Sequence, residues 1–184
     1  MENKNFHLNY FIAGGLTISF IVSVIGTMFE SQSAIQTIFF KIDALFAISA
    51  YACLASKTTS ENYDIPAAGF SILAIAQGLF LTELEEANKW NYTSESLGVL
   101  FMIPAMILIS YYSVFPKWLR VGGILSIIPF IILLIIRALM KNIHTDLIEN
   151  IVFLIYQLVT LCWAWAIWKL RIKNFKFIKL RDRD

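Results

Sequence analysis

The sequence predicts an all-α, polytopic membrane protein built as a six-transmembrane-helix bundle. Hydrophobic residues make up 58% of the 184 residues and charged residues 15%, whereas an average soluble domain has about 25% charged residues. Lys and Arg also concentrate in alternate connecting segments. Each of six apolar runs holds about 18 to 23 residues, enough to cross a ~30 Å hydrocarbon core as a helix. The runs cover residues 9–29, 34–56, 65–82, 96–115, 118–140 and 147–168.

All six runs have the features of membrane helices rather than barrel strands, and the starts of the second and third are marked by local signals. A backbone in lipid must satisfy its own hydrogen bonds, and the runs lack the ~10-residue alternation of barrel strands. The first run exceeds the about 7 to 15 residues of a signal-peptide core, so we expect it to be retained as a helix. Ser33 and Gln36 have capping-box spacing at the start of the second run. Asp64 followed by Pro66 suits the opening turn of the third helix.

The last three runs are marked by proline and by a second capping box. Pro104 and Pro129 lie in the middle of the fourth and fifth runs, where each removes a backbone hydrogen bond and can kink its helix. Pro116 suits the opening of the fifth helix. Asp146 with Glu149 has capping-box spacing at the start of the sixth helix.

The distribution of positive charge predicts the orientation. Three Lys or Arg residues lie in the segments on one side, namely Lys89, Arg137 and Lys141. Eleven lie on the other side, namely Lys4, Lys57, Lys117, Arg120, Lys169, Arg171, Lys173, Lys176, Lys179, Arg181 and Arg183. Because an excess of positive charge marks the cytoplasmic side, we expect a multi-pass protein with both termini in the cytoplasm.

Small residues recur at the starts of the odd-numbered runs. Residues 13–15 (Ala-Gly-Gly), 67–69 (Ala-Ala-Gly) and 121–123 (Val-Gly-Gly) are each separated by 54 positions. The spacing suggests three repeated helical hairpins, although small residues are also common in membrane helices without any repeat. Small-residue stripes on the first and third helices predict that these two lie at the centre of the bundle.

Four ionisable residues are expected at one depth below the outer surface: Lys41, Asp43, Glu83 and Arg137. Counting along the helices puts each of them about 21 to 24 Å from the inner end. Ionisable residues inside a membrane are functional candidates, and a substrate or ion vestibule is one interpretation. The other is a charge network at the headgroup boundary. In either case we expect Asp43 to pair with Arg137 and Lys41 with Glu83.

Two further groups of polar residues are candidates. An outer acidic cluster could ligate a divalent cation or activate water beside lipid headgroups, or it could be an exposed acidic cap; its members are Glu85, Glu86, His144, Asp146 and Glu149. Near mid-membrane, Gln77 and Gln157 should each need a hydrogen-bond partner on another helix. No metal is assigned and no cofactor is expected.

The chain divides into a transmembrane domain, residues 1–168, and a basic amphipathic tail, residues 169–184. Trp163, Trp165 and Trp168 precede the tail as an aromatic belt. The tail alternates cations with apolar residues, which predicts binding to anionic lipids of the inner leaflet. Nucleic-acid binding is not expected, because it would leave those apolar residues exposed.

Three functions fit these patterns. The first is a non-enzymatic membrane subunit, receptor-like or assembly module, with a membrane-protein partner or a second copy of the chain. The second is a small-solute or ion transporter with an outer ionic vestibule. The third is a lipid-active membrane enzyme that uses the outer acidic cluster. The sequence leans away from an enzyme, since no catalytic motif is present.

Overall fold

The computed structural model describes the chain except for residues 1, 31–32, 84–91, 140–145 and 172–184. It is all-α in the described part, with seven helices: α1 (Glu2–Gly26), α2 (Ala34–Ser60), α3 (Asp64–Glu83), α4 (Tyr92–Tyr111), α5 (Lys117–Leu125), α6 (Ile127–Leu139) and α7 (Asp146–Arg171). Since α5 and α6 form one span, Lys117–Ile136, the helices make six spans. Five of these are long and apolar enough to cross a membrane, and the described apolar part of α4, Leu97–Tyr111, is shorter. The predicted all-α six-helix bundle is confirmed.

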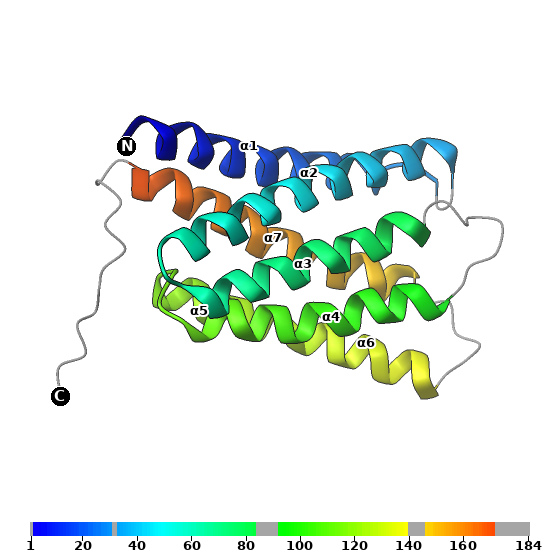
Figure 1. The fold of residues 1–184 in the computed structure, drawn as a ribbon. Helices are drawn as coiled ribbons and strands as arrows, with labels where there is room; N and C mark the ends of the chain where they lie inside the picture. The colour runs from blue at the N-terminus through cyan, green and yellow to red at the C-terminus, as the bar shows by residue number, and fades with distance from the viewer. Residues whose placement is uncertain (1, 31–32, 84–91, 140–145, 172–184) are drawn as a thin grey trace.

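The six spans form a closed ring in sequence order (Figure 1). Each helix packs on the next, from α1 through α4 to the α5–α6 span and from that span to α7, and α7 closes the ring against α1. No other pair of helix backbones comes into contact within the part of the chain that the structure describes. Helix α1 begins and α7 ends at the same end of the bundle. An even number of crossings therefore brings the chain back to the side where it started.

The centre of the ring holds side chains rather than a helix, which corrects the prediction that the first and third helices lie there. Trp163 of α7 is fully buried, stacks on Phe115 at a centroid distance of 5.6 Å, and meets the edge of Phe70 at 5.8 Å. Trp163 therefore does not belong to the predicted belt, whereas Trp165 and Trp168 are about half exposed, at 52% and 54%. The small-residue stripes fail as a guide because a flat helix face can pack sideways against a neighbour as well as toward an axis.

Three glycines at the predicted repeat spacing each lie at a close helix crossing. A methyl group added at Gly15 would come within 3.3 Å of the Cβ of Ala50 on α2, and one added at Gly69 within 2.7 Å of Ile109 on α4. The third glycine, Gly123, faces Ser110 of α4 instead of α7. The third pair of spans thus differs from the first two, because its odd-numbered member crosses the preceding helix.

The fifth span is interrupted at Ser126, between α5 and α6. Pro129 has no amide hydrogen to donate to the carbonyl group four residues earlier, and this weakens the helix here. At the end of α5, the amide of Ser126 still donates to the carbonyl of Gly122 at 2.9 Å, and its hydroxyl donates to that of Gly123 at 2.7 Å. Pro104, by contrast, lies inside an unbroken α4.

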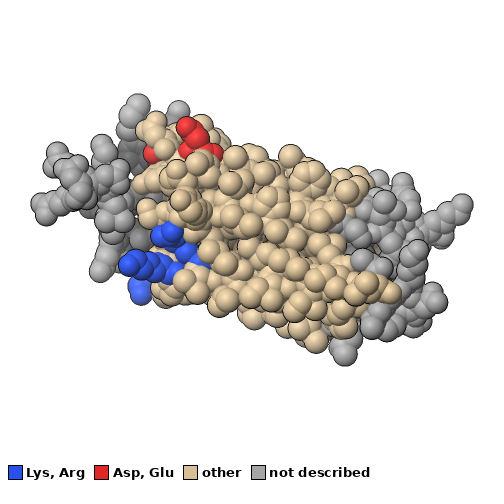
Figure 2. All heavy atoms as spheres, turned by 90° about the horizontal axis from the view of Figure 1, so that it is seen from below, with Lys and Arg blue, Asp and Glu red and all other residues tan. Residues whose placement is uncertain are grey.

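The outer surface of the ring is apolar. Every span exposes large hydrophobic side chains, among them Phe11, Ile38, Ile75, Leu100, Ile132 and Leu154. On the face drawn in Figure 2, the charged side chains of the described residues gather at one end, and the middle shows none. A wide apolar surface of this kind is suited to lipid tails. The chain is a multi-pass membrane protein in contact with the bilayer.

Candidate functional site

A carboxylate lies inside the ring, where three helices converge. Asp43 of α2 is 8% exposed. Its Oδ1 accepts a hydrogen bond from the hydroxyl of Ser19 on α1, and its Oδ2 accepts one from Nε2 of Gln157 on α7 at 3.2 Å. Ser23, one turn along α1 from Ser19, also hydrogen-bonds the carboxylate. We call Ser19, Ser23, Asp43, Gln157 and Thr160 the Asp43 cluster.

Local sequence spacing builds the walls of this cluster. Ser19 and Ser23 are four residues apart, so both hydroxyls lie on the same face of α1. On α7, the hydroxyl of Thr160 donates to the backbone carbonyl of Gln157 at 2.8 Å and lies 3.3 Å from its Oε1. These contacts hold the Gln157 amide between Thr160 and Asp43. Gln157 therefore has its predicted kind of partner, a polar group on another helix.

A pair of tyrosines extends the polar contacts across the centre of the ring. The hydroxyls of Tyr51 on α2 and Tyr156 on α7 are 2.5 Å apart, and both residues are about 1% exposed. Gln77 of α3 also forms a side-chain hydrogen bond with Tyr156. Because Tyr156 and Gln157 are adjacent on α7, the tyrosine pair and the Asp43 cluster lie next to each other. Polar groups from α1, α2, α3 and α7 thus meet in an otherwise apolar interior.

The charge of Asp43 is the unusual feature of this site. Each hydrogen-bond donor that the structure gives the carboxylate is neutral: Ser19, Ser23 and Gln157. Neutral donors solvate a buried carboxylate without cancelling its charge, and a lone buried charge is costly. The site is therefore suited to binding one positive charge, as a proton or as a cation.

The vestibule predicted from depth is described only in part. Lys41 and Asp43 both lie on α2, with Lys41 partly exposed. The side chains of Glu83 and Arg137 fall outside the described residues, so the ion pairs expected for them stay predictions. Helices α2 and α6, which carry Asp43 and Arg137, do not pack against each other in the described ranges.

Most side chains of the predicted outer acidic cluster lie outside the described residues. Glu85, Glu86 and His144 lie outside the described residues, as does the side chain of Asp146, although α7 begins at Asp146. Glu149 is buried. Where side chains are described, no group of three or more His, Cys, Asp or Glu residues could hold a metal ion. The prediction of a lipid-active enzyme rests on these outer residues and stays a prediction.

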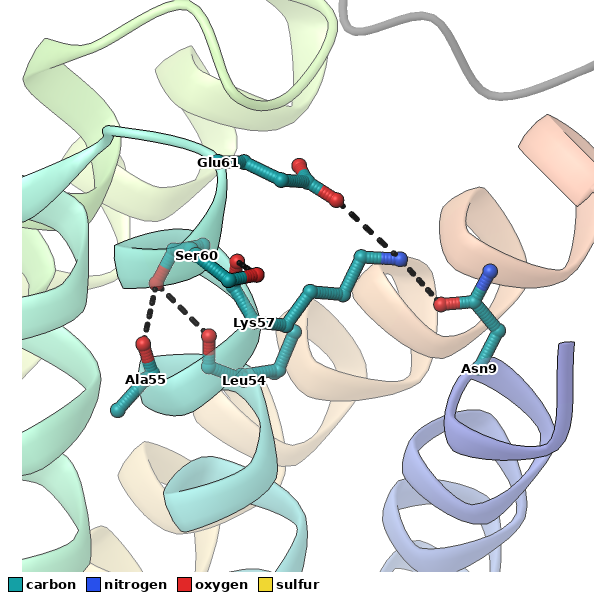
Figure 3. Close-up of polar contacts among 7 residues, drawn as sticks. Asn9, Leu54, Ala55, Lys57, Ser60 and Glu61 are labelled. Atoms are coloured by element: carbon teal, nitrogen blue, oxygen red, sulfur yellow. Dashed lines mark hydrogen bonds and ion pairs between the residues drawn. The ribbon is translucent and has the colours of Figure 1, made fainter. Parts of the chain in front are cut away.

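A further buried charge, that of Lys57 at the end of the ring where α1 begins, was not predicted from the sequence. Lys57, near the end of α2, donates to the side-chain oxygen of Asn9 on α1 and lies 3.8 Å from Glu61 (Figure 3). Burial raises the pKa of the Glu61 carboxyl, and the nearby Lys57 charge partly opposes this shift. The i, i+4 spacing of Lys57 and Glu61 was a visible signal, whereas no local pattern marks Asn9 as their neighbour.

The fold and the cluster together define a class: a multi-pass membrane protein with a closed ring of spans around a buried polar site. Comparison with known proteins adds no narrower assignment. No protein-family model, no curated protein and no solved structure matches the chain. Its function is therefore argued from its own geometry.

Proposed function

We propose that the chain is a non-enzymatic, receptor-like membrane module that takes up one positive charge at Asp43, inside its ring of helices. The observation that carries this proposal is a buried carboxylate whose three hydrogen-bond donors are all neutral. Because these donors come from α1 and α7 while Asp43 lies on α2, a charge bound there would change the packing among three helices. Such coupling is what a receptor-like module needs.

Infrared spectroscopy of the full-length protein in lipid tests charge uptake directly. As the pH falls, we expect a carbonyl band of a protonated carboxyl group to grow in the wild-type protein and to be missing from Asp43→Asn. Glu61→Gln is the matched control, since it removes a carboxyl group at the end of the ring and should leave the Asp43 band in place. Identical pH titrations of the wild type and Asp43→Asn would overturn the proposal.

A transporter is the second candidate, and the interrupted fifth span is the observation that favours it. Discontinuous helices near the bilayer centre are typical of secondary transporters, and this span breaks at Ser126, beside Pro129. Uptake of an ion or small solute into reconstituted vesicles, lost in Asp43→Asn, would favour this function over a receptor-like one.

For the orientation, we propose that both termini face the cytoplasm and that the basic tail lies on the anionic inner leaflet. Support comes from the excess of Lys and Arg on that side. A reporter that is active only in the cytoplasm should be active when fused after Asp184 and inactive when inserted after Ser31. The reverse pattern would contradict the orientation.

A further inference from the structure

We infer that the charge taken up at Asp43 is a small monovalent metal cation of the Na⁺ or Li⁺ type, which exchanges with a proton. This inference rests on the proposed function and names its ligand. Three observations support it: the kind of atoms in the Asp43 cluster, the number of charges there and the closeness of its groups.

The cluster offers oxygen atoms almost exclusively. Asp43 supplies two carboxylate oxygens, Ser19 and Ser23 supply hydroxyls beside them, and the hydroxyl of Thr160 lies next to the Gln157 amide. Hard cations prefer oxygen ligands, whereas softer transition metals favour imidazole or thiolate. The three helices α1, α2 and α7 would share one ion, as expected of a ligand that fixes their packing.

The side-chain amide of Gln157 can interact with either occupant of the site, the proton or the cation. In the structure its Nε2 donates to Asp43, while its Oε1 lies 3.3 Å from the hydroxyl of Thr160. A half-turn of the amide exchanges the two atoms. Its oxygen then faces the carboxylate and a bound cation, and Thr160 can accept a hydrogen bond from Nε2, because a hydroxyl both donates and accepts. Thr160 thus accommodates both orientations.

The charge balance indicates a single positive charge. One carboxylate cancels one such charge, while a divalent ion would leave an uncompensated charge in the apolar interior. Among the described residues, Tyr51 on the same helix and Tyr156 on α7 interact electrostatically with Asp43, and the groups that hydrogen-bond it from α1 are serine hydroxyls. Lys41, two positions earlier on α2, lies on a different face of that helix. Phenols and hydroxyls are neutral near pH 7, so none of these groups supplies the missing charge.

The closeness of the groups indicates a bare ion rather than an organic cation. The Ser19 hydroxyl and the Gln157 amide both touch the carboxylate, and all three residues are buried. A metal ion can replace the proton on the Asp43 carboxyl group with small movements of these side chains. An alkylammonium group would have to separate α1 from α7, which pack against each other.

Thermal unfolding of the detergent-solubilised full chain, with equilibrium dialysis against radioactive Na⁺, tests the inference. At pH 8, NaCl or LiCl should raise the Tm above its value in choline chloride of equal ionic strength. As the pH falls into the range where a proton competes, the Na⁺ concentration for half of the effect should rise about tenfold per pH unit. Dialysis should find one Na⁺ bound per chain.

Two variants separate the possible results. Gln157→Leu should weaken Na⁺ binding at least tenfold while keeping the Asp43 carbonyl band in the infrared titration, because it removes an ion ligand and leaves the carboxyl group. Glu61→Gln should retain the Na⁺ response. Equal Tm values in all salts, with the Asp43 band still titrating, would overturn the cation and leave the proposed function standing. Loss of the band as well would overturn both, and stabilisation by Ca²⁺ in place of Na⁺ would contradict the charge argument.

Discussion

Replacing Trp163 with alanine should lower the free energy of unfolding by about 3 to 5 kcal/mol, the range for truncating a large aromatic side chain in a packed core. Trp163 lies where the ring has no central helix, between Phe70 and Phe115. The backbones around it are held apart by their neighbours in the ring, so they cannot close over the space left by the indole. Unfolding in mixed detergent micelles would measure the loss.

Trp168→Ala is the matched control for this change. The side chain of Trp168 is about half exposed on the outside of the ring and meets Tyr10 edge to face at 6.2 Å. Lipid or detergent can occupy the space that it leaves, so we expect a loss of less than about 1 kcal/mol. Similar losses for the two variants would argue against a core made of interior side chains.

Gly69→Ala should be the next most damaging change, by about 1 to 3 kcal/mol, as is typical of overpacking. The added methyl group would lie 2.7 Å from Ile109 and 3.0 Å from the backbone carbonyl oxygen of Ala105. Since a carbonyl oxygen moves only with its helix, α3 and α4 would have to separate. The free energy of unfolding and the Tm both report this loss.

The chain offers internal controls for that experiment. Apart from the adjacent residues and the backbone of the same helix, no described atom lies within 4 Å of the position that a methyl group would take at Gly14 or Gly122. Alanine there should be neutral or should stabilise by about 0.5 to 1 kcal/mol, because glycine weakens a helix interior by that amount. A loss at Gly122 as large as at Gly69 would mean that backbone flexibility, rather than close packing, explains these glycines.

The polar interior illustrates how far residue type predicts a site. Asp43, Gln77 and Gln157 stand out in the sequence because polar groups in a membrane span need partners. The partners themselves could not be inferred, since counting residues gives depth along a helix but not the direction in which a side chain points around the ring. Equal depth predicted Arg137 as the partner of Asp43, and that pair stays a prediction because the Arg137 side chain lies outside the described residues. Depth gave no sign of Ser19 and Gln157, which the structure places at the two carboxylate oxygens.

The 54-residue repeat likewise predicts where helices pack closely but not which helices pack together. The 54-residue spacing identified three glycines that all lie at close crossings, but it implied three similar hairpins. Gly123 instead crosses α4, and α7 packs on α1. A glycine permits close approach by any neighbouring helix, so its position in the sequence does not select which helix that is.

By itself, the sequence determined the six apolar spans, the start of α2 at its Ser33 cap and the start of α7 at Asp146. These follow from local properties, because each helix satisfies its own backbone hydrogen bonds and each span must match the thickness of the bilayer. Only the tertiary structure decided that the spans close into a ring, that Trp163 fills its centre and that Ser19 and Gln157 donate hydrogen bonds to Asp43. In lipid, apolar residues contribute little to the association of helices. The fit between side chains from distant segments therefore decides which helices pack together.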